Sequence, residues 1–163
     1  MKTAIIFSSK HGTTAKVAEM LAEQLKLDEI KLFNLQHKNE VNLQEFEAVI
    51  LGTAIYAGRP MKKTKRFIRR NLKTLKTKKI GLFICGMDPG KEKQAEEMRA
   101  SFPDVLLNHA TTKYYLGGEF IFEDLSFFER FIVKKVSKVN KSISLIHHEN
   151  IKKFVKEFKG ETN

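Results

Sequence analysis

The sequence predicts an α/β fold in which a doubly wound parallel sheet carries helices on both faces. Five strand-like runs alternate with helix-like segments along the 163 residues. Repeated strand–helix units of this kind imply parallel strands joined by right-handed crossovers. Three of the runs are apolar at almost every position, as expected of strands that are covered on both faces. The length suits one domain, and residues 1–163 show no repeat, low-complexity segment or linker.

The expected strands cover Thr3–Ser8, Ile30–Leu35, Ala48–Ala54, Lys79–Cys85 and Thr111–Leu116. The second alternates in character, which favours a position near an edge of the sheet. Helical spacing of apolar residues predicts helices over Thr13–Lys26, Met61–Leu75, Glu92–Ser101 and His148–Phe158, with a short turn at Leu43–Phe46. In such sheets a ligand lies beyond the carboxyl ends of the strands, at the point where the strand order reverses.

The loop between the first strand and the first helix is rich in hydroxyl groups. Ser8, Ser9, Thr13 and Thr14 surround a single glycine, Gly12. Amides at a helix start carry partial positive charge, so such a loop can hold a phosphate. It lacks the Gly-Lys-Ser/Thr of a Walker loop, the three glycines of a dinucleotide fingerprint and the acidic pair of a receiver domain. Two interpretations stay open: a phosphate-monoester site without an obligatory metal, and an ordinary turn with Thr13 as N-cap.

This loop resembles the first loop of flavodoxins, Ser/Thr-x-Thr-Gly-x-Thr. Ser9, Gly12 and Thr14 match that pattern, whereas His11 replaces the usual threonine. The resemblance implies a flavodoxin-like five-stranded sheet of order 2-1-3-4-5. It also implies flavin mononucleotide (FMN) as the cofactor, with its 5′-phosphate held by the loop residues Ser9, Lys10, His11, Gly12, Thr13 and Thr14.

The loop after the third strand is expected to pack against the flavin ring, as the same resemblance implies. Tyr56 is the candidate to stack on the ring, because a suitably offset aromatic face gains roughly 1 kcal/mol beyond area burial. Gly58 permits a positive φ, so a peptide here can turn to accept a hydrogen bond from the reduced flavin. The alternative is a plain turn with Tyr56 on the surface. The residues assigned to this contact are Thr53, Ala54, Ile55, Tyr56, Ala57 and Gly58.

The third loop contributes Cys85, Gly86 and Met87, without the aromatic residue that flavodoxins usually carry there. Cys85 is the only cysteine, which excludes an intrachain disulfide and fits a reducing compartment. We expect a small buried residue at this position and assign it no chemistry. No metal site is expected. The start of the chain has no signal-peptide pattern, so we expect a cytoplasmic protein, with attachment to the inner face of the cell membrane left open.

Positive charge is concentrated in one segment. Arg59–Lys79 holds eleven of the 30 basic residues and no acidic residue, and the remaining basic residues are as numerous as the 19 acidic ones. The segment therefore accounts for the whole net charge of +11. An anionic membrane surface, an acidic protein or nonspecific nucleic-acid binding would each suit it, and a solvated helix face is the alternative. No motif for specific nucleic-acid recognition is present.

A second unusual segment follows the fifth expected strand. Residues 117–124 precede an expected extra amphipathic helix, and five of the 13 phenylalanines lie between 120 and 131. The apolar stripe of Phe127–Lys141 is flanked by lysines. It suits either packing on the body of the protein or contact with anionic lipid.

With this segment, the chain resembles bacterial menaquinone-dependent protoporphyrinogen oxidases over nearly its whole length. The residues that carry the resemblance are Met1–Thr3, Phe7–Ser9, Gly52–Gly58, Gly117–Gly118 and Phe128–Phe131. It implies an FMN oxidoreductase that passes electrons from a reduced substrate, a tetrapyrrole, to a quinone. One alternative is a non-enzymatic flavodoxin that carries electrons between redox proteins. Another is a basic module that binds nucleic acid without a flavin.

Overall fold

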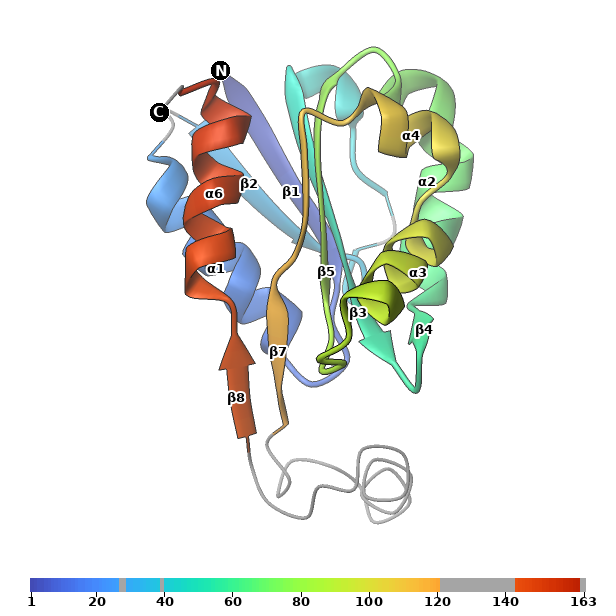
Figure 1. Ribbon diagram of the computed structural model, residues 1–163. Helices are drawn as coiled ribbons and strands as arrows, with labels where there is room; N and C mark the ends of the chain where they lie inside the picture. Colours follow the sequence, from blue (N-terminus) through green and yellow to red (C-terminus); the bar gives the residue numbers. More distant parts are fainter. Residues whose placement is uncertain (27–28, 39, 121–142, 162–163) are drawn as a thin grey trace.

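The computed structural model describes residues 1–26, 29–38, 40–120 and 143–161. Its centre is a sheet with five parallel strands in the order β2-β1-β3-β5-β6 (Figure 1). This confirms the predicted order 2-1-3-4-5, because β6 is the fifth strand expected from the sequence. The strands are β1 (Lys2–Ser8), β2 (Glu29–Asn34), β3 (Ala48–Tyr56), β5 (Lys79–Cys85) and β6 (Thr112–Tyr115).

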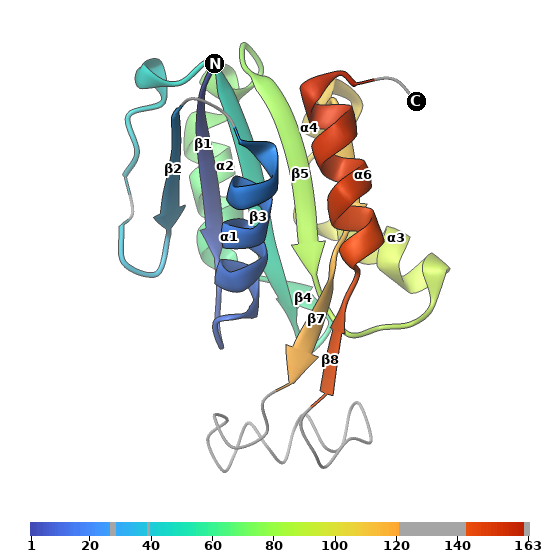
Figure 2. The same ribbon diagram turned by 90° about the vertical axis from the view of Figure 1, so that its left-hand side faces the viewer.

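Helices cover both faces of the sheet (Figure 2). One face carries α1 (Thr13–Leu25) and α6 (His148–Lys159), and the other carries α2 (Lys62–Leu75), α3 (Lys91–Ser101) and α4 (Asp104–His109). Successive side chains of a strand point to opposite faces. In β1, Ile5 therefore belongs to the core beneath α1 and α6, and Ile6 belongs to the core beneath α2.

Most expected elements begin and end within two residues of the observed ones. β2 is largely exposed, as an edge strand should be, whereas β1, β3 and β5 are buried over most of their length. α1 ends at Leu25 because Lys26 adopts a left-handed conformation with φ 47°. The short turn is the 3₁₀ helix η1 (Leu43–Glu45), where the Asn42 side chain accepts a hydrogen bond from the Gln44 N–H.

Four short elements were not expected from the sequence. β4 (Arg59–Pro60) pairs antiparallel with the end of β3, and β7 (Gly117–Phe120) pairs antiparallel with β8 (Ile143–Ile146). α4 follows α3 directly. Two- to six-residue elements carry too few positions for a hydrophobic period to show. The extra helix expected within Phe127–Lys141 lies outside the described residues. Among the helices that are described, none has the length and apolar character needed to cross a membrane.

Candidate functional site

Three loops meet at the carboxyl ends of β1, β3 and β5, at the lower end of the sheet in Figure 1. They enclose a small hollow of about 50 Å³, which we call the inner pocket. Two of its residues, Gly118 and Glu119, belong to β7 and were missed by sequence reasoning. The other ten were all predicted: Ser9, Lys10, His11, Thr13, Thr14, Ala54, Ile55, Cys85, Gly86 and Met87. The structure therefore brings together residues from all three predicted loops.

The loop predicted to hold the phosphate, Ser9–Thr14, which we call the phosphate loop, leaves the first turn of α1 open. Gly12 is the N-cap residue with φ 90°, a conformation that favours glycine, and no side chain caps the helix. The interpretation with Thr13 as N-cap is therefore wrong. The Thr13 hydroxyl instead donates to the Glu119 carbonyl at 3.3 Å, and the Ser9 hydroxyl accepts from the Gly12 N–H at 3.1 Å. Because the first turn of α1 also lacks acidic residues, its positive end suits an anion.

Thr14 provides the clearest sign of a ligand at this loop. Its side chain is buried, and among the described residues its hydroxyl has no hydrogen-bond partner. A buried hydroxyl without a partner costs roughly 1–3 kcal/mol, so its presence needs an explanation. A phosphate oxygen at the start of α1 would accept this hydrogen bond. The donors present therefore fit the 5′-phosphate of FMN.

Cys85 is buried and lines the inner pocket. Complete burial raises the pKa of its thiol to about 12, although the neighbouring Thr14 hydroxyl opposes this rise. Even so, the Thr14 hydroxyl has no hydrogen-bond partner in the described part of the chain. The thiol stays protonated at neutral pH and is a poor nucleophile. This agrees with the expectation of a small buried residue at this position.

The loop predicted to lie beside the flavin ring is a tight β-hairpin, which we call the ring-side hairpin. Tyr56 at the end of β3 pairs with Arg59 of β4, and the two residues between them, Ala57 and Gly58, have φ values of 49° and 76°. Positive φ at both central residues is typical of a type I′ hairpin turn. Sequence reasoning expected this conformation at Gly58 but not at Ala57. The hairpin fixes where Tyr56 sits relative to the phosphate loop.

Tyr56 is half-buried and connects the first two loops. The Lys10 ammonium lies 4.2 Å from the centre of its ring, and the His11 ring lies 6.0 Å away. A cation over an aromatic face at this distance is attractive. Tyr56 is therefore part of the loop cluster, and its stacking on a flavin ring stays a prediction.

A larger hollow of about 610 Å³, the outer pocket, lies beside the hairpin. Its volume falls in the range of small-molecule and cofactor sites. It is lined by Gln36, Tyr56, Ala57, Arg59, Pro60, Met61, Lys62 and Lys63. A third hollow of about 590 Å³ includes Gly12 and borders the phosphate loop. Gln36 and Met61 line both hollows, and nothing in the sequence pattern had singled them out.

Thr53 has a different place from the one expected. It is fully buried beneath the loops, and its hydroxyl accepts a hydrogen bond from the Met61 N–H at 3.0 Å. Met61 is the N-cap residue of α2. Thr53 thus holds the start of α2 against β3, and its hydroxyl is used in this structural contact.

Glu119 connects the antiparallel strand pair β7–β8 to the phosphate loop and to α1. Its carboxylate accepts hydrogen bonds from Ser144 of β8 at 2.7 Å and from Lys16 of α1 at 3.1 Å. The Ser144 hydrogen bond, with Lys16 in support, lowers the pKa of Glu119 against the effect of burial. The carboxylate is therefore charged at neutral pH and holds three elements together.

Comparisons with known proteins agree with this geometry. A flavodoxin from Clostridium saccharobutylicum is 41% identical over 59 residues, which span 34% of this chain and 37% of that protein. The protoporphyrinogen IX dehydrogenase (quinone) of Escherichia coli K12 is 20% identical over 146 residues, 86% of this chain and 81% of that enzyme. Among solved structures, a Fusobacterium nucleatum flavodoxin bound to FMN has a TM-score of 0.54 at 19% identity, with both chains covered completely.

The F. nucleatum flavodoxin has the same fold, and its structure contains FMN. This confirms the cofactor that was predicted from the first loop, because flavodoxins bind FMN. The family described as Flavodoxin domain matches residues 4–145, which is most of the chain. On this match, the chain belongs to the flavodoxin domain family.

Proposed function

We propose that this protein is an FMN-dependent oxidoreductase that dehydrogenates a protoporphyrinogen-type tetrapyrrole and passes the electrons to a quinone. The observation that carries the proposal is the antiparallel strand pair β7–β8, which Glu119 joins to the loop between β1 and α1 and to α1. The five strands and the three loops account for the FMN site predicted here, and the strand pair β7–β8 is an addition beside it. The similarity to the E. coli dehydrogenase over 86% of the chain supports an enzyme with this addition.

The protein's own residues bind and orient the cofactor. Ser9, the amides that follow Gly12, and Thr14 would hold the phosphate, and Tyr56 would pack against the ring. Bound FMN supplies two-electron redox chemistry. In each cycle the substrate loses two electrons and two protons. The quinone takes up two electrons and two protons and becomes a quinol. The proposal includes peripheral contact with the inner face of the membrane, because such a quinone is dissolved in the lipid bilayer.

A non-enzymatic electron carrier is the second candidate. The observation in its favour is the 41% identity to a flavodoxin over 59 residues. A carrier needs the same FMN site but no substrate pocket, so the phosphate loop alone does not separate the two candidates.

One experiment separates them. The purified protein is loaded with FMN, loading is checked by its visible absorption, and protoporphyrinogen is added with a menaquinone analogue. We expect porphyrin fluorescence to rise in proportion to the quinone consumed. Absence of turnover, together with rapid reduction by a flavodoxin reductase, would assign the protein to the carriers. A preparation that takes up no FMN would contradict both candidates.

A further inference from the structure

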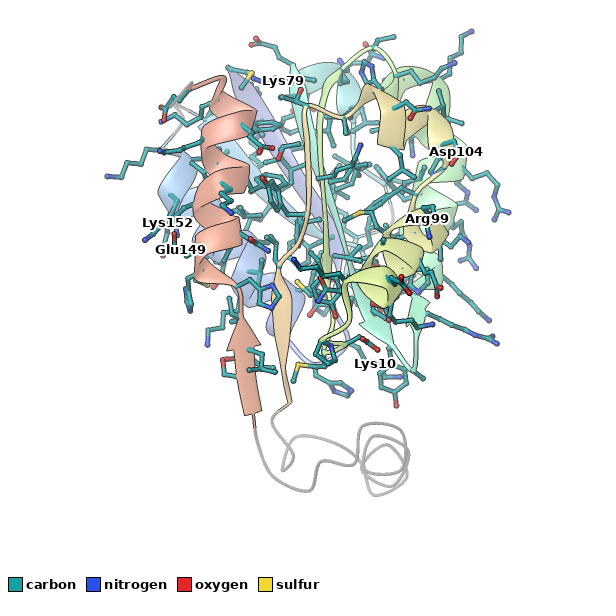
Figure 3. All side chains as sticks on the ribbon, viewed as in Figure 1. Lys10, Lys79, Arg99, Asp104, Glu149 and Lys152 are labelled. Atoms are coloured by element: carbon teal, nitrogen blue, oxygen red, sulfur yellow. The ribbon has the colours of Figure 1, made fainter. Side chains whose placement is uncertain are left out.

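The basic segment Arg59–Lys79 places most of its basic residues on the exposed side of α2, whereas the Lys79 ammonium lies 4.9 Å from the centre of the Phe158 ring of α6, on the other side of the sheet. The segment comprises β4, α2 and the turn that leads into β5. Seven of its cations are exposed on α2 and its C-cap: Lys62, Lys65, Arg66, Arg69, Arg70, Lys73 and Lys76. We call this surface the α2 face. Figure 3 shows long side chains fanning out from the outer side of this helix.

The charges of the α2 face are not neutralised by the rest of the described chain. None of the eleven basic residues of Arg59–Lys79 forms an ion pair with a described residue. Like charges crowded on one helix repel one another and destabilise the compact state. An anionic surface placed against them would relieve this repulsion.

The apolar side of α2 is already used by the core. Thr64, Phe67, Ile68 and Leu75 are buried against the sheet. The large apolar side chains that are exposed in the described residues, such as Val105 and Leu145, all lie on other elements. The α2 face therefore offers charge without an apolar anchor, so any contact with lipid is electrostatic and reversible rather than inserted.

The α2 face begins at the ring-side hairpin. Arg59 pairs with Tyr56, and the outer pocket joins both to Lys62 and Lys63 at the start of α2. A surface that binds the α2 face therefore lies next to the edge where the flavin ring is expected. This placement favours a membrane as the occupant, because the proposed electron acceptor is dissolved in it.

We propose that the α2 face docks the protein on anionic phospholipid headgroups, with the ring-side hairpin at the bilayer surface. This inference rests on the proposed function for the identity of the acceptor. In this proposal, the basic side chains of the α2 face attract the anionic headgroups, and salt weakens that attraction.

Vesicle sedimentation tests the docking without FMN or turnover. Vesicles of phosphatidylcholine with and without phosphatidylglycerol are mixed with the protein. We expect binding only to the anionic vesicles, and loss of binding at high salt, since screening shortens the reach of charges from about 8 Å to about 3 Å between 0.15 M and 1 M salt. The double variant Lys65→Gln/Arg69→Gln should bind roughly 30-fold more weakly, because each basic residue contributes about fivefold.

The matched control is Lys152→Gln/Lys153→Gln on α6, on the opposite side of the sheet. Lys152 pairs there with Glu149 (Figure 3), and Lys153 is exposed. Both double variants lower the net charge by the same amount, and thermal unfolding checks that both fold. We expect the control to bind like the unmodified protein. Equal losses in the two variants would mean that net charge alone acts, and unchanged binding of the α2 variant would overturn the proposal.

A second measurement links docking to electron transfer. The α2 variant should lose turnover with a menaquinone embedded in anionic vesicles and keep turnover with a water-soluble quinone. Loss with both quinones contradicts a docking role for these residues. Absence of turnover in the unmodified protein with either quinone contradicts the proposed function instead, while sedimentation still decides the docking. Unchanged vesicle binding with weakened binding of an acidic ferredoxin would assign the α2 face to a protein partner and overturn the proposal.

Discussion

Replacing Thr14 by valine should change FMN affinity and stability in opposite directions. The hydroxyl is buried and has no hydrogen-bond partner among the described residues, and valine has nearly the same shape. Removing an unsatisfied hydroxyl should stabilise the FMN-free protein by about 1 kcal/mol. For a domain of this size, that raises the melting temperature by roughly 2–4 °C.

The same change removes a hydrogen bond to the phosphate. Hydrogen bonds to charged groups are worth about 1.5–3 kcal/mol. Since about 1.4 kcal/mol corresponds to a tenfold change, Thr14→Val should weaken FMN binding by roughly 10- to 150-fold. Titration of the FMN-free protein, followed by quenching of flavin fluorescence, measures the affinity. Thermal unfolding of the same sample measures the stability.

The control for this prediction is Thr112→Val. Thr112 is also buried, but its hydroxyl donates to the Glu157 carboxylate at 2.8 Å, and it lies on β6 outside the three loops. Its loss should lower stability by about 1.5–3 kcal/mol and leave FMN affinity unchanged. If Thr14→Val binds FMN as tightly as the unmodified protein, the hydroxyl does not contact the phosphate and the assignment of this loop is wrong.

Four further predictions follow from the same structure. Ala57→Gly should raise the stability of the FMN-free protein by about 1 kcal/mol in thermal unfolding, because Ala57 is exposed and held at φ 49°; a lower melting temperature would contradict this. Glu119→Gln should lower the free energy of unfolding at pH 7, because the folded protein lowers the pKa of Glu119 and so favours its charged form. This stabilisation is present above pH 4.5 and is lost as the pH falls through the pKa of Glu119 in the folded protein, so the two proteins should be equally stable in acid. A difference in stability that persists at low pH would refute this. Cys85, with its pKa raised to about 12, should react with a disulfide reagent at pH 8 only after unfolding. Because of Arg59–Lys79, the reduction potential in a potentiometric titration should be less negative than that of acidic flavodoxins, most clearly at low salt.

Much of the candidate site was predictable because local sequence determines it. A buried strand, a glycine with hydroxyl neighbours and an amphipathic helix specify a phosphate loop within the first 25 residues. The strand order then places the loops after β1 and β3 side by side. Ten of the fifteen predicted residues accordingly line the inner pocket.

Thr53 and Glu119 show where this reasoning stopped. A threonine near a cofactor loop has the same pattern whether it faces the ligand or caps a neighbouring element. Only the fold shows that Thr53 holds the N–H of Met61. Glu119 lies 103 residues from Lys16 in sequence, and no local pattern predicts a contact over such a separation.

The strand order was implied by the resemblance to flavodoxins. The sequence by itself determined the class of the fold and the concentration of charge in Arg59–Lys79, and it predicted the phosphate loop. These depend on hydrophobic period and on residue types that are close along the chain. The tertiary structure decided that the apolar side of α2 is buried while its charges face outward, that Ala57 adopts a left-handed conformation, and that β7 and β8 meet beside the phosphate loop. These depend on packing between distant segments, because an amphipathic pattern states that a face will be covered but not what covers it.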